Sequence, residues 1–254
     1  MLYCRELGQG EPVVVIHGLF GMSDNMLSLG KSLSTRYHVI LVDLAYHGRS
    51  PHAGGLSHSS QARAIFNTLD NLGIAQFRVI GHSLGGKVAM QMALLEPQRI
   101  TALVVGDIAP ILYRDDRHGS IFAAFKSVPL AQIARRSDAD EFMSQFVDEA
   151  AVRQFLLKNL YRNSDGEFCW RADIQALEQA YAKIISGPDI QAQYQGPVLF
   201  IKGQHSDYIT AAAQPAIEAF FPAFEFKIMS GVGHWLHAEK PALFHALVAR
   251  FFAS

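Results

Sequence analysis

Short apolar runs alternate with helical patterns along most of this chain, and that alternation limits the folds open to it. The runs are rich in valine and isoleucine and are nearly continuous in apolarity: Val13–Ile16, His38–Asp43, Phe77–Gly81, Thr101–Gly106, Val198–Lys202 and Phe224–Met229. Strands that are covered by helices on both faces have this character. The helical patterns fall between them, at Ser28–Ser34, Ser60–Leu72, Gly85–Leu95 and Pro241–Phe252. The sequence therefore predicts an α/β fold with a mostly parallel central sheet flanked by helices.

The interval from Pro110 to Gln195 breaks this alternation. It holds no convincing strand pattern, yet it separates two strong ones. Leu177, Tyr181 and Ile184 recur in it at helical spacing, and a structureless loop of this length is implausible inside a compact domain. We expect one domain over residues 1–254, in which residues 110–195 form a helical cap inserted between two strands. Most cap phenylalanines are expected to be packing residues: Phe122, Phe125, Phe142, Phe146 and Phe155.

Composition excludes several classes of protein. Hydrophobic residues make up 50% of the chain and charged residues 18%, which is unlike a disordered protein. The net charge is −1, so a nucleic-acid partner is not expected. Cys4 and Cys169 form no C-x-x-C pair, and no apolar run approaches a membrane span or a secretory leader. We expect a cytoplasmic protein with no membrane span, no disulfide framework and no cysteine-based zinc site.

The segment Gly81-His82-Ser83-Leu84-Gly85 matches the pattern G-x-S-x-G. The pattern alone is common, but here a strand pattern precedes it and a helical pattern follows it. A serine at a sharp strand-to-helix bend adopts strained backbone angles, and flanking glycines relieve the crowding. The first amides of the following helix then point at an anion that forms beside the serine. The segment therefore predicts a nucleophile elbow with Ser83 as the nucleophile.

With this elbow, the chain resembles the α/β-hydrolase family over its whole length. The motifs recur in family order: His17-Gly18-Leu19-Phe20-Gly21, then Asp43 with His47-Gly48-Arg49-Ser50, then the elbow, then Gly233-His234. Within the family the chain looks most like the small bacterial YbfF-type esterases, through the segments HGLFG, GHSLGGKVAM, GDIAP and GHWLHAEKP. One departure is Ala45, where many relatives carry arginine.

A serine hydroxyl needs a neighbouring base, and the chain offers 11 histidines. His234 lies in a glycine turn after the last strand pattern, and it comes last in the order that this fold uses for its triad. We therefore predict that His234 is the base. His17 and His82 are expected to be hydrogen-bonded scaffold. No histidine spacing indicates a metal site, so neither metal nor organic cofactor is expected.

Two aspartates are candidates for the third member of the triad. Asp107 ends the strand pattern at Thr101–Gly106, and the resemblance to YbfF-type esterases implies an acid at that strand end. Asp207 follows the next strand, where many α/β-hydrolases keep theirs. The usual spacing counted from Gly203 reaches Ser206, however, so Asp207 comes one residue late. Asp107 is the favoured acid and Asp207 the alternative.

The oxyanion of a tetrahedral intermediate needs two preorganised backbone donors. We assign these to the amides of Leu84, directly after the nucleophile, and of Leu19 in the His17–Gly21 turn. The complete prediction is a serine hydrolase that cleaves a small-molecule carboxylic ester or acyl thioester through an acyl-enzyme. The alternatives are a carbon–carbon bond hydrolase or lyase on the same fold, or a non-catalytic binding protein.

Overall fold

The computed structural model describes residues 1–253, and its core is a seven-stranded sheet. In spatial order the strands are β1 (Cys4–Leu7), β3 (Tyr37–Val42), β2 (Glu11–Ile16), β4 (Phe77–His82), β5 (Ile100–Gly106), β8 (Val198–Gly203) and β9 (Phe224–Met229). Only β1 runs antiparallel to its neighbour, β3. The chain visits β3 on one side of β2 and then crosses to β4 on the other. Such a reversal opens a crevice at the carboxyl ends of the strands, where ligands bind in folds of this kind.

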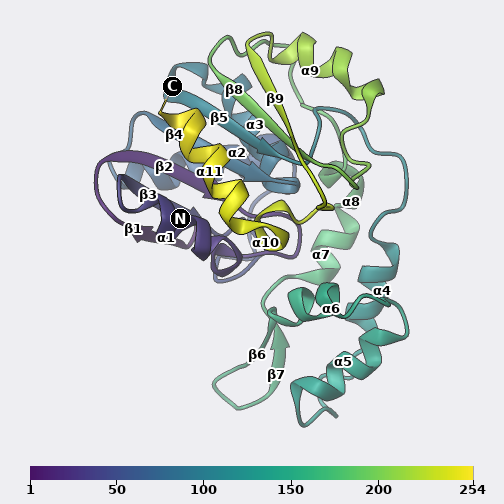
Figure 1. Cartoon of the computed structure of the whole chain (residues 1–254). Helices are drawn as coiled ribbons and strands as arrows, with labels where there is room; N and C mark the ends of the chain where they lie inside the picture. Colours follow the sequence, from purple (N-terminus) through teal and green to yellow (C-terminus); the bar gives the residue numbers. More distant parts are fainter. Residues whose placement is uncertain (254) are drawn as a thin grey trace.

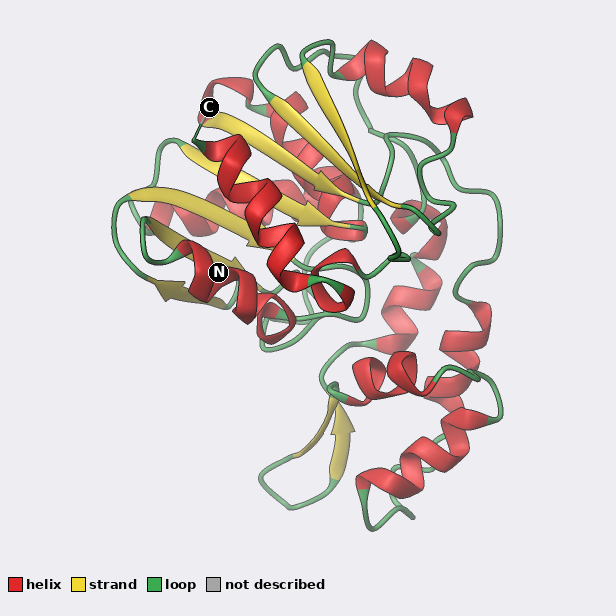
Figure 2. Cartoon of the chain, in the orientation of Figure 1, coloured by secondary structure: helices red, strands yellow, loops and turns green. Residues whose placement is uncertain are grey.

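Helices cover both faces of the sheet (Figure 2). One face packs on α1 (Leu27–Leu33) and α11 (Pro241–Phe252), through side chains such as Leu29 and Phe244. The other packs on α2 (His58–Asn71), α3 (Leu84–Leu95) and α9 (Gln214–Phe220). Successive strand residues alternate between the two cores: Val13 and Val15 belong to one, Val14 and Ile16 to the other. This double coverage explains why the strands read as continuous apolar runs.

The chain between β5 and β8 forms a separate group of elements beyond the carboxyl ends of the parallel strands (Figure 1). Its elements are α4 (Gly119–Ser127), α5 (Arg136–Ser144), α6 (Ala150–Leu157), β6 (Leu160–Arg162), β7 (Phe168–Trp170), α7 (Ile174–Gln179) and α8 (Tyr181–Ile184). A short helix α10 (Leu236–Glu239) and three 3₁₀ turns, Ser23–Met26, Pro97–Arg99 and Ala211–Ala213, complete the elements. Within residues 1–253, no helix combines the length and apolarity that crossing a membrane requires.

A single buried lysine ties both crossings between the sheet and this insertion to α3. The Lys87 ammonium donates to the carbonyl of Ile111 at 2.7 Å and to that of Ser186 at 2.6 Å. It also lies 4.8 Å from the centre of the Tyr113 ring. Burial lowers the pKa of Lys87 to about 7. Since a neutral amine still carries two N–H groups, it can donate to both carbonyls in either charge state.

The α/β architecture and its mostly parallel sheet are confirmed, and the six predicted strands are present with ends shifted by at most two residues. The expectation that residues 110–195 hold no strand was wrong, because β6 and β7 form an antiparallel hairpin there. Three-residue strands are too short to show a period of two. Strand β1 was missed for a similar reason, since its four residues Cys-Arg-Glu-Leu carry no apolar run.

Candidate active site

Ser83 stands at the bend between β4 and α3 with φ 53° and ψ −120°, a strained conformation for a residue with a side chain. Its amide donates to the Gly106 carbonyl at 2.9 Å, which holds the bend against β5. A Cβ on Gly81 would lie 2.1 Å from the Gly85 carbonyl oxygen, and one on Gly85 would lie 2.3 Å from that of Ile16. Both flanking positions therefore require glycine, as the G-x-S-x-G pattern predicted.

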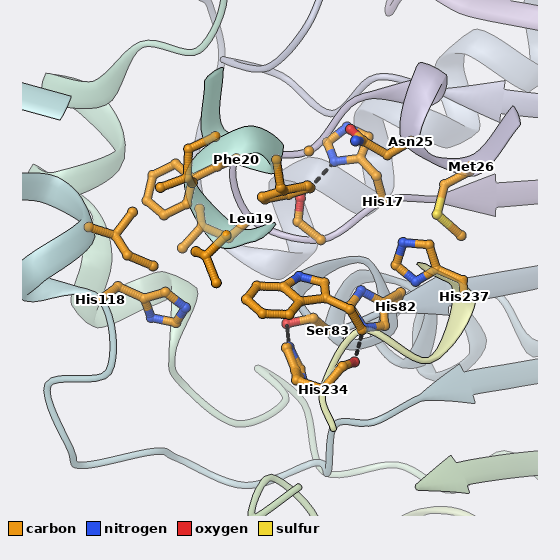
Figure 3. Close-up of a pocket in the computed structure, with 17 residues that line it drawn as sticks. His17, Leu19, Phe20, Asn25, Met26, His82, Ser83, His118, His234 and His237 are labelled. Atoms are coloured by element: carbon orange, nitrogen blue, oxygen red, sulfur yellow. Dashed lines mark hydrogen bonds between the residues drawn. The ribbon is translucent and has the colours of Figure 1, made fainter. Parts of the chain in front are cut away.

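Ser83, His234 and Asp107 form one chain of hydrogen bonds (Figure 3 shows the serine facing the imidazole). The Ser83 hydroxyl is 3.0 Å from His234 Nε2, and His234 Nδ1 is 2.7 Å from Asp107 Oδ2. Because the carboxylate accepts at Nδ1, the proton of the neutral imidazole sits there and Nε2 is left to accept from the serine. The arrangement can take the hydroxyl proton as an attack on a substrate begins.

Asp107 is completely buried, with every observed contact on its carboxylate coming from a donor. Besides His234, the amide of Gly203 donates to Oδ1 at 3.0 Å and the hydroxyl of Ser206 donates to Oδ2. Ser206 stands at the position where the usual spacing would place an acid. No role is predicted for this residue from the sequence. The count was a usable signal, because it marked the loop position whose hydroxyl contacts the Asp107 carboxylate.

Asp207 lies elsewhere. Its carboxylate is exposed and 2.6 Å from Arg117 Nη1, and this hydrogen bond holds the pKa of Asp207 below its usual value. The Arg117 guanidinium lies over the Tyr208 ring, 4.6 Å from its centre. The Tyr208 ring also stacks on the His234 imidazole, with the ring centres 3.9 Å apart and 19° between the planes. Asp207 thus holds a residue of the insertion against the ring that covers the imidazole.

The turn from His17 to Gly21 is fixed by hydrogen bonds around the Gly18 carbonyl. His17 Nδ1 donates to it at 2.8 Å and the Gly21 amide donates to it at 2.9 Å, while His17 Nε2 accepts from the Leu44 amide at 3.1 Å. These partners fix the tautomer of His17, whose pKa is lowered by burial. In a planar trans peptide the next N–H points opposite to the carbonyl. The Leu19 amide is therefore directed away from this cluster, and the whole turn packs against Ser83, whose Cβ would be 3.2 Å from a Cβ on Gly18.

The insertion also holds this turn. Asn159, two residues after the end of α6, donates through Nδ2 to the Phe20 carbonyl at 2.8 Å across a sequence separation of 139 residues. Phe20 has φ 60°, so it is a second strained residue at the site. Its ring packs on Phe122 and Phe125 of the insertion at 5.2 and 5.1 Å. Asn159 could not be predicted from the sequence, because a single asparagine carries no local pattern.

Two cavities meet at Ser83, Leu19 and His118. One extends below α6 and is walled by Ile121, Val152, Phe155, Leu156 and Trp235 among others. The other extends toward α8 and is walled by Leu84, Ile108, Tyr113, Ile184 and Tyr208 among others. Both walls are largely apolar. Phe122 and Phe125 are buried in the core, and Phe142 and Phe155 pack against it, as predicted. Phe155 also lines the first cavity, whereas Phe146 is exposed, so the packing prediction was wrong for Phe146.

Buried histidines surround the group of Ser83, His234 and Asp107, and burial keeps them neutral. His82 Nε2 donates to the His234 carbonyl at 2.7 Å, which supports the loop from below. Burial, followed by the neighbouring His237 and His234, lowers the pKa of His82 well below its usual value. His47 lies beside His17, with ring centres 5.2 Å apart, and burial lowers the pKa of His47 to about 3. His17 and His82 were predicted to make structural hydrogen bonds, and both do. His17 bonds to the Gly18 carbonyl and the Leu44 amide, and His82 bonds to the His234 carbonyl.

A protein-family model described as the alpha/beta hydrolase fold matches residues 11–241. Two curated relatives are similar over most of the chain. The Mus musculus protein named sn-1-specific diacylglycerol lipase ABHD11 is 36% identical over 248 residues, which are 95% of this chain and 80% of the relative. Esterase YbfF of Escherichia coli is 38% identical over 230 residues, which are 91% of this chain and 88% of the relative.

A solved structure described as a marine microorganism esterase superposes with a TM-score of 0.96 at 36% identity. The match covers 98% of both chains. The structure of E-2-(acetamidomethylene)succinate hydrolase superposes with a TM-score of 0.79 at 21% identity, covering all of this chain and 95% of the other. This second likeness concerns the fold alone.

The buried His47 should make the fold sensitive to acid. Its pKa is about 3 in the folded protein and near 6.5 unfolded, so between these values the unfolded chain binds more protons and stability falls as pH falls. The His47→Asn variant keeps a donor for the Ala45 carbonyl, which His47 Nδ1 contacts at 3.0 Å, but does not titrate. From pH 7 to pH 4, the wild type should lose about 3 kcal/mol more unfolding free energy than the variant. Urea unfolding at each pH measures this. Equal losses would contradict it.

Proposed function

This chain belongs to the α/β-hydrolase family, and from that premise we propose that it hydrolyses carboxylic esters through an acyl-enzyme formed on Ser83. The observation that carries the proposal is the continuous hydrogen-bonded chain from Ser83 through His234 to Asp107, at 3.0 and 2.7 Å. The names of the relatives, an esterase and a diacylglycerol lipase, support ester substrates.

The proposed reaction has two halves. Ser83 Oγ attacks the ester carbonyl carbon while its proton passes to His234 Nε2, and Asp107 stabilises the imidazolium that forms. The alcohol then leaves with the proton from Nε2. In the second half a water molecule gives its proton to Nε2 and attacks the acyl carbon, and the acid leaves as Ser83 recovers its hydrogen. A thioester would follow the same path with a thiol as the leaving group.

The oxyanion would be held by the amides of Leu84 and Leu19. Leu84 is the first residue of α3, and the first amides of a helix have no intrahelical acceptor. The Leu19 amide belongs to the turn that His17 and Asn159 hold rigid. Preorganised donors of this kind stabilise charge in the transition state without a reorganisation cost. Neither role depends on the leucine side chains.

We also propose that the insertion, residues 110–195, is a cap that selects the substrate. Its residues Ile121, Val152, Phe155 and Leu156 wall the cavity below α6, and apolar walls favour an acyl chain there. The second cavity, toward α8, would take the alcohol portion. Tyr208 and Arg117 lie on that side, so Asp207 would act on the substrate cavity through Arg117.

Replacing the nucleophile tests the proposal. Ser83→Ala should lower kcat for p-nitrophenyl esters by several orders of magnitude, because no hydroxyl remains to form the acyl-enzyme. After a fluorophosphonate probe, mass spectrometry should place the adduct on Ser83, and His234→Ala should prevent labelling. His82→Ala is the matched control and should still be labelled. An adduct elsewhere, or loss of labelling in His82→Ala with retention in His234→Ala, would overturn the assignment.

Replacing each aspartate by asparagine distinguishes the roles of Asp107 and Asp207. Asp107→Asn keeps the shape but favours the wrong imidazole tautomer, a change that costs about 10⁴ in kcat in serine proteases. Asp207→Asn should cost about tenfold or less, since it weakens only the exposed contact with Arg117. Steady-state kinetics on one ester compare them. If Asp207→Asn lost as much kcat as Asp107→Asn, the acid would be misassigned.

Chain-length preference tests the cap. Each methylene buried in the cavity adds about 0.8 kcal/mol of transfer free energy, or about fourfold in kcat/KM. Phe155→Ala should therefore lower kcat/KM for long acyl chains more than for acetyl esters. The control is Phe146→Ala, which removes an exposed phenylalanine of the same insertion. The substrates should include acyl-CoA thioesters as well as esters of graded acyl length. If the wild type, Phe155→Ala and Phe146→Ala had identical chain-length profiles, Phe155 would be a packing residue with no part in substrate selection.

A further inference from the structure

The last strand of the sheet, β9, leaves apolar side chains uncovered at an open edge. It pairs only with β8 among the strands of residues 1–253, and Figure 1 shows it at the end of the sheet. Phe226 is 37% exposed and Ile228 59% exposed. With Phe224 they line a groove of about 430 Å³ beside α9. Natural sheets normally protect an open edge strand against pairing with another chain. An edge strand with exposed apolar side chains is therefore a candidate for pairing with a further strand.

The hydrogen bonds between β8 and β9 show which backbone groups point outward. The Val198 amide donates to the Ala223 carbonyl and the Gln204 amide to the Met229 carbonyl. Backbone groups of successive strand residues point to alternate sides, so Glu225 and Lys227 share that inward direction. Phe224, Phe226 and Ile228 therefore direct their N–H and C=O groups to the open edge.

From this pattern we propose that β9 pairs antiparallel with β9 of a second copy of this chain, about a two-fold axis at Phe226. Phe226 would then face its own counterpart, and Phe224 would face Ile228 of the second copy. Each of these is a hydrogen-bonded pair that exchanges two backbone hydrogen bonds, because the outward groups belong to these residues. A two-fold interface of this kind closes on itself and continues one sheet through both copies.

The same register pairs the charges. Glu225 of one copy faces Lys227 of the other, twice about the axis, in non-hydrogen-bonded pairs whose side chains lie closest. Both residues point to the α11 side of the sheet, where they line a second groove of about 390 Å³ with Leu247 and Arg250. On the opposite side, the three apolar residues would bring Phe224, Phe226 and Ile228 of both copies together. When two copies of the segment Phe224-Glu225-Phe226-Lys227-Ile228 lie antiparallel, apolar residues therefore face apolar residues and opposite charges face each other.

A second copy fits this edge better than an unrelated peptide does, because one five-residue segment supplies both halves of every pair. None of these residues lines the cavities at Ser83. The β9 edge is therefore separate from the proposed catalytic site, and substitutions in it should leave esterase activity unchanged.

Sedimentation equilibrium from about 1 to 100 μM tests the pairing by charge exchange. The wild type should form dimers. Lys227→Glu and Glu225→Lys each place like charges opposite one another, and each should weaken the dimer about tenfold or more. The double variant Glu225→Lys/Lys227→Glu should restore it. Mixing the two single variants should give a heterodimer, because their edges are oppositely charged.

A proline variant supplies a second measurement. Phe226→Pro removes an outward N–H that β8 does not use, so it should abolish the dimer while thermal unfolding still shows one cooperative transition. A monomeric wild type over the whole range would overturn the proposal. So would single charge variants that dimerise as strongly as the wild type, or a double variant that stays monomeric. A dimer that survives Phe226→Pro would place the interface elsewhere.

Discussion

The buried carboxylate of Asp107 is the constraint on which the site depends. An ionised carboxylate is tolerated away from water only when donors surround it. Here the donors come from three places: the imidazole of His234, the amide of Gly203 and the hydroxyl of Ser206. One charge therefore joins the ends of β5 and β8 to the loop that carries the histidine. The distance from His234 to Ser83 follows from this junction, since the imidazole has been aimed before any substrate arrives.

The insertion acts on the same site through three separate contacts with the sheet body. Lys87 ties its two crossings to α3, Asn159 holds the turn that carries Leu19, and Arg117 lies on the ring stacked against His234. Each contact reaches a different part of the proposed machinery: the elbow helix, the oxyanion turn and the base. The insertion is thus a wall of the cavity and also a support for the groups around it.

The amino-acid sequence predicts best those features of the site whose residues are close together along the chain. The elbow could be predicted because the two glycines, the serine and the flanking strand and helix are contiguous, and His234 because it lies in a glycine turn. The choice between Asp107 and Asp207 stayed open because parallel strands bring two strand ends to one edge, and one residue of displacement decides which side chain points inward. Ser206, Asn159 and Arg117 act on partners 90 to 139 residues away, so no local pattern reveals them. Strands β1, β6 and β7 were not predicted, because three or four residues are too few to show a strand pattern.

Four residues other than glycine have positive φ within residues 1–253, and three of them stand at this site: Phe20, Ser83 and Asp107. Each conformation costs on the order of 1–3 kcal/mol. Glycine would adopt all three without that cost, but it would remove the proposed nucleophile, the proposed acid or the ring packed against the insertion. At Ser83, whose side chain is small, stability alone would favour glycine. A serine at this bend costs stability, which is what we expect of a residue retained for the proposed chemistry and not for the fold.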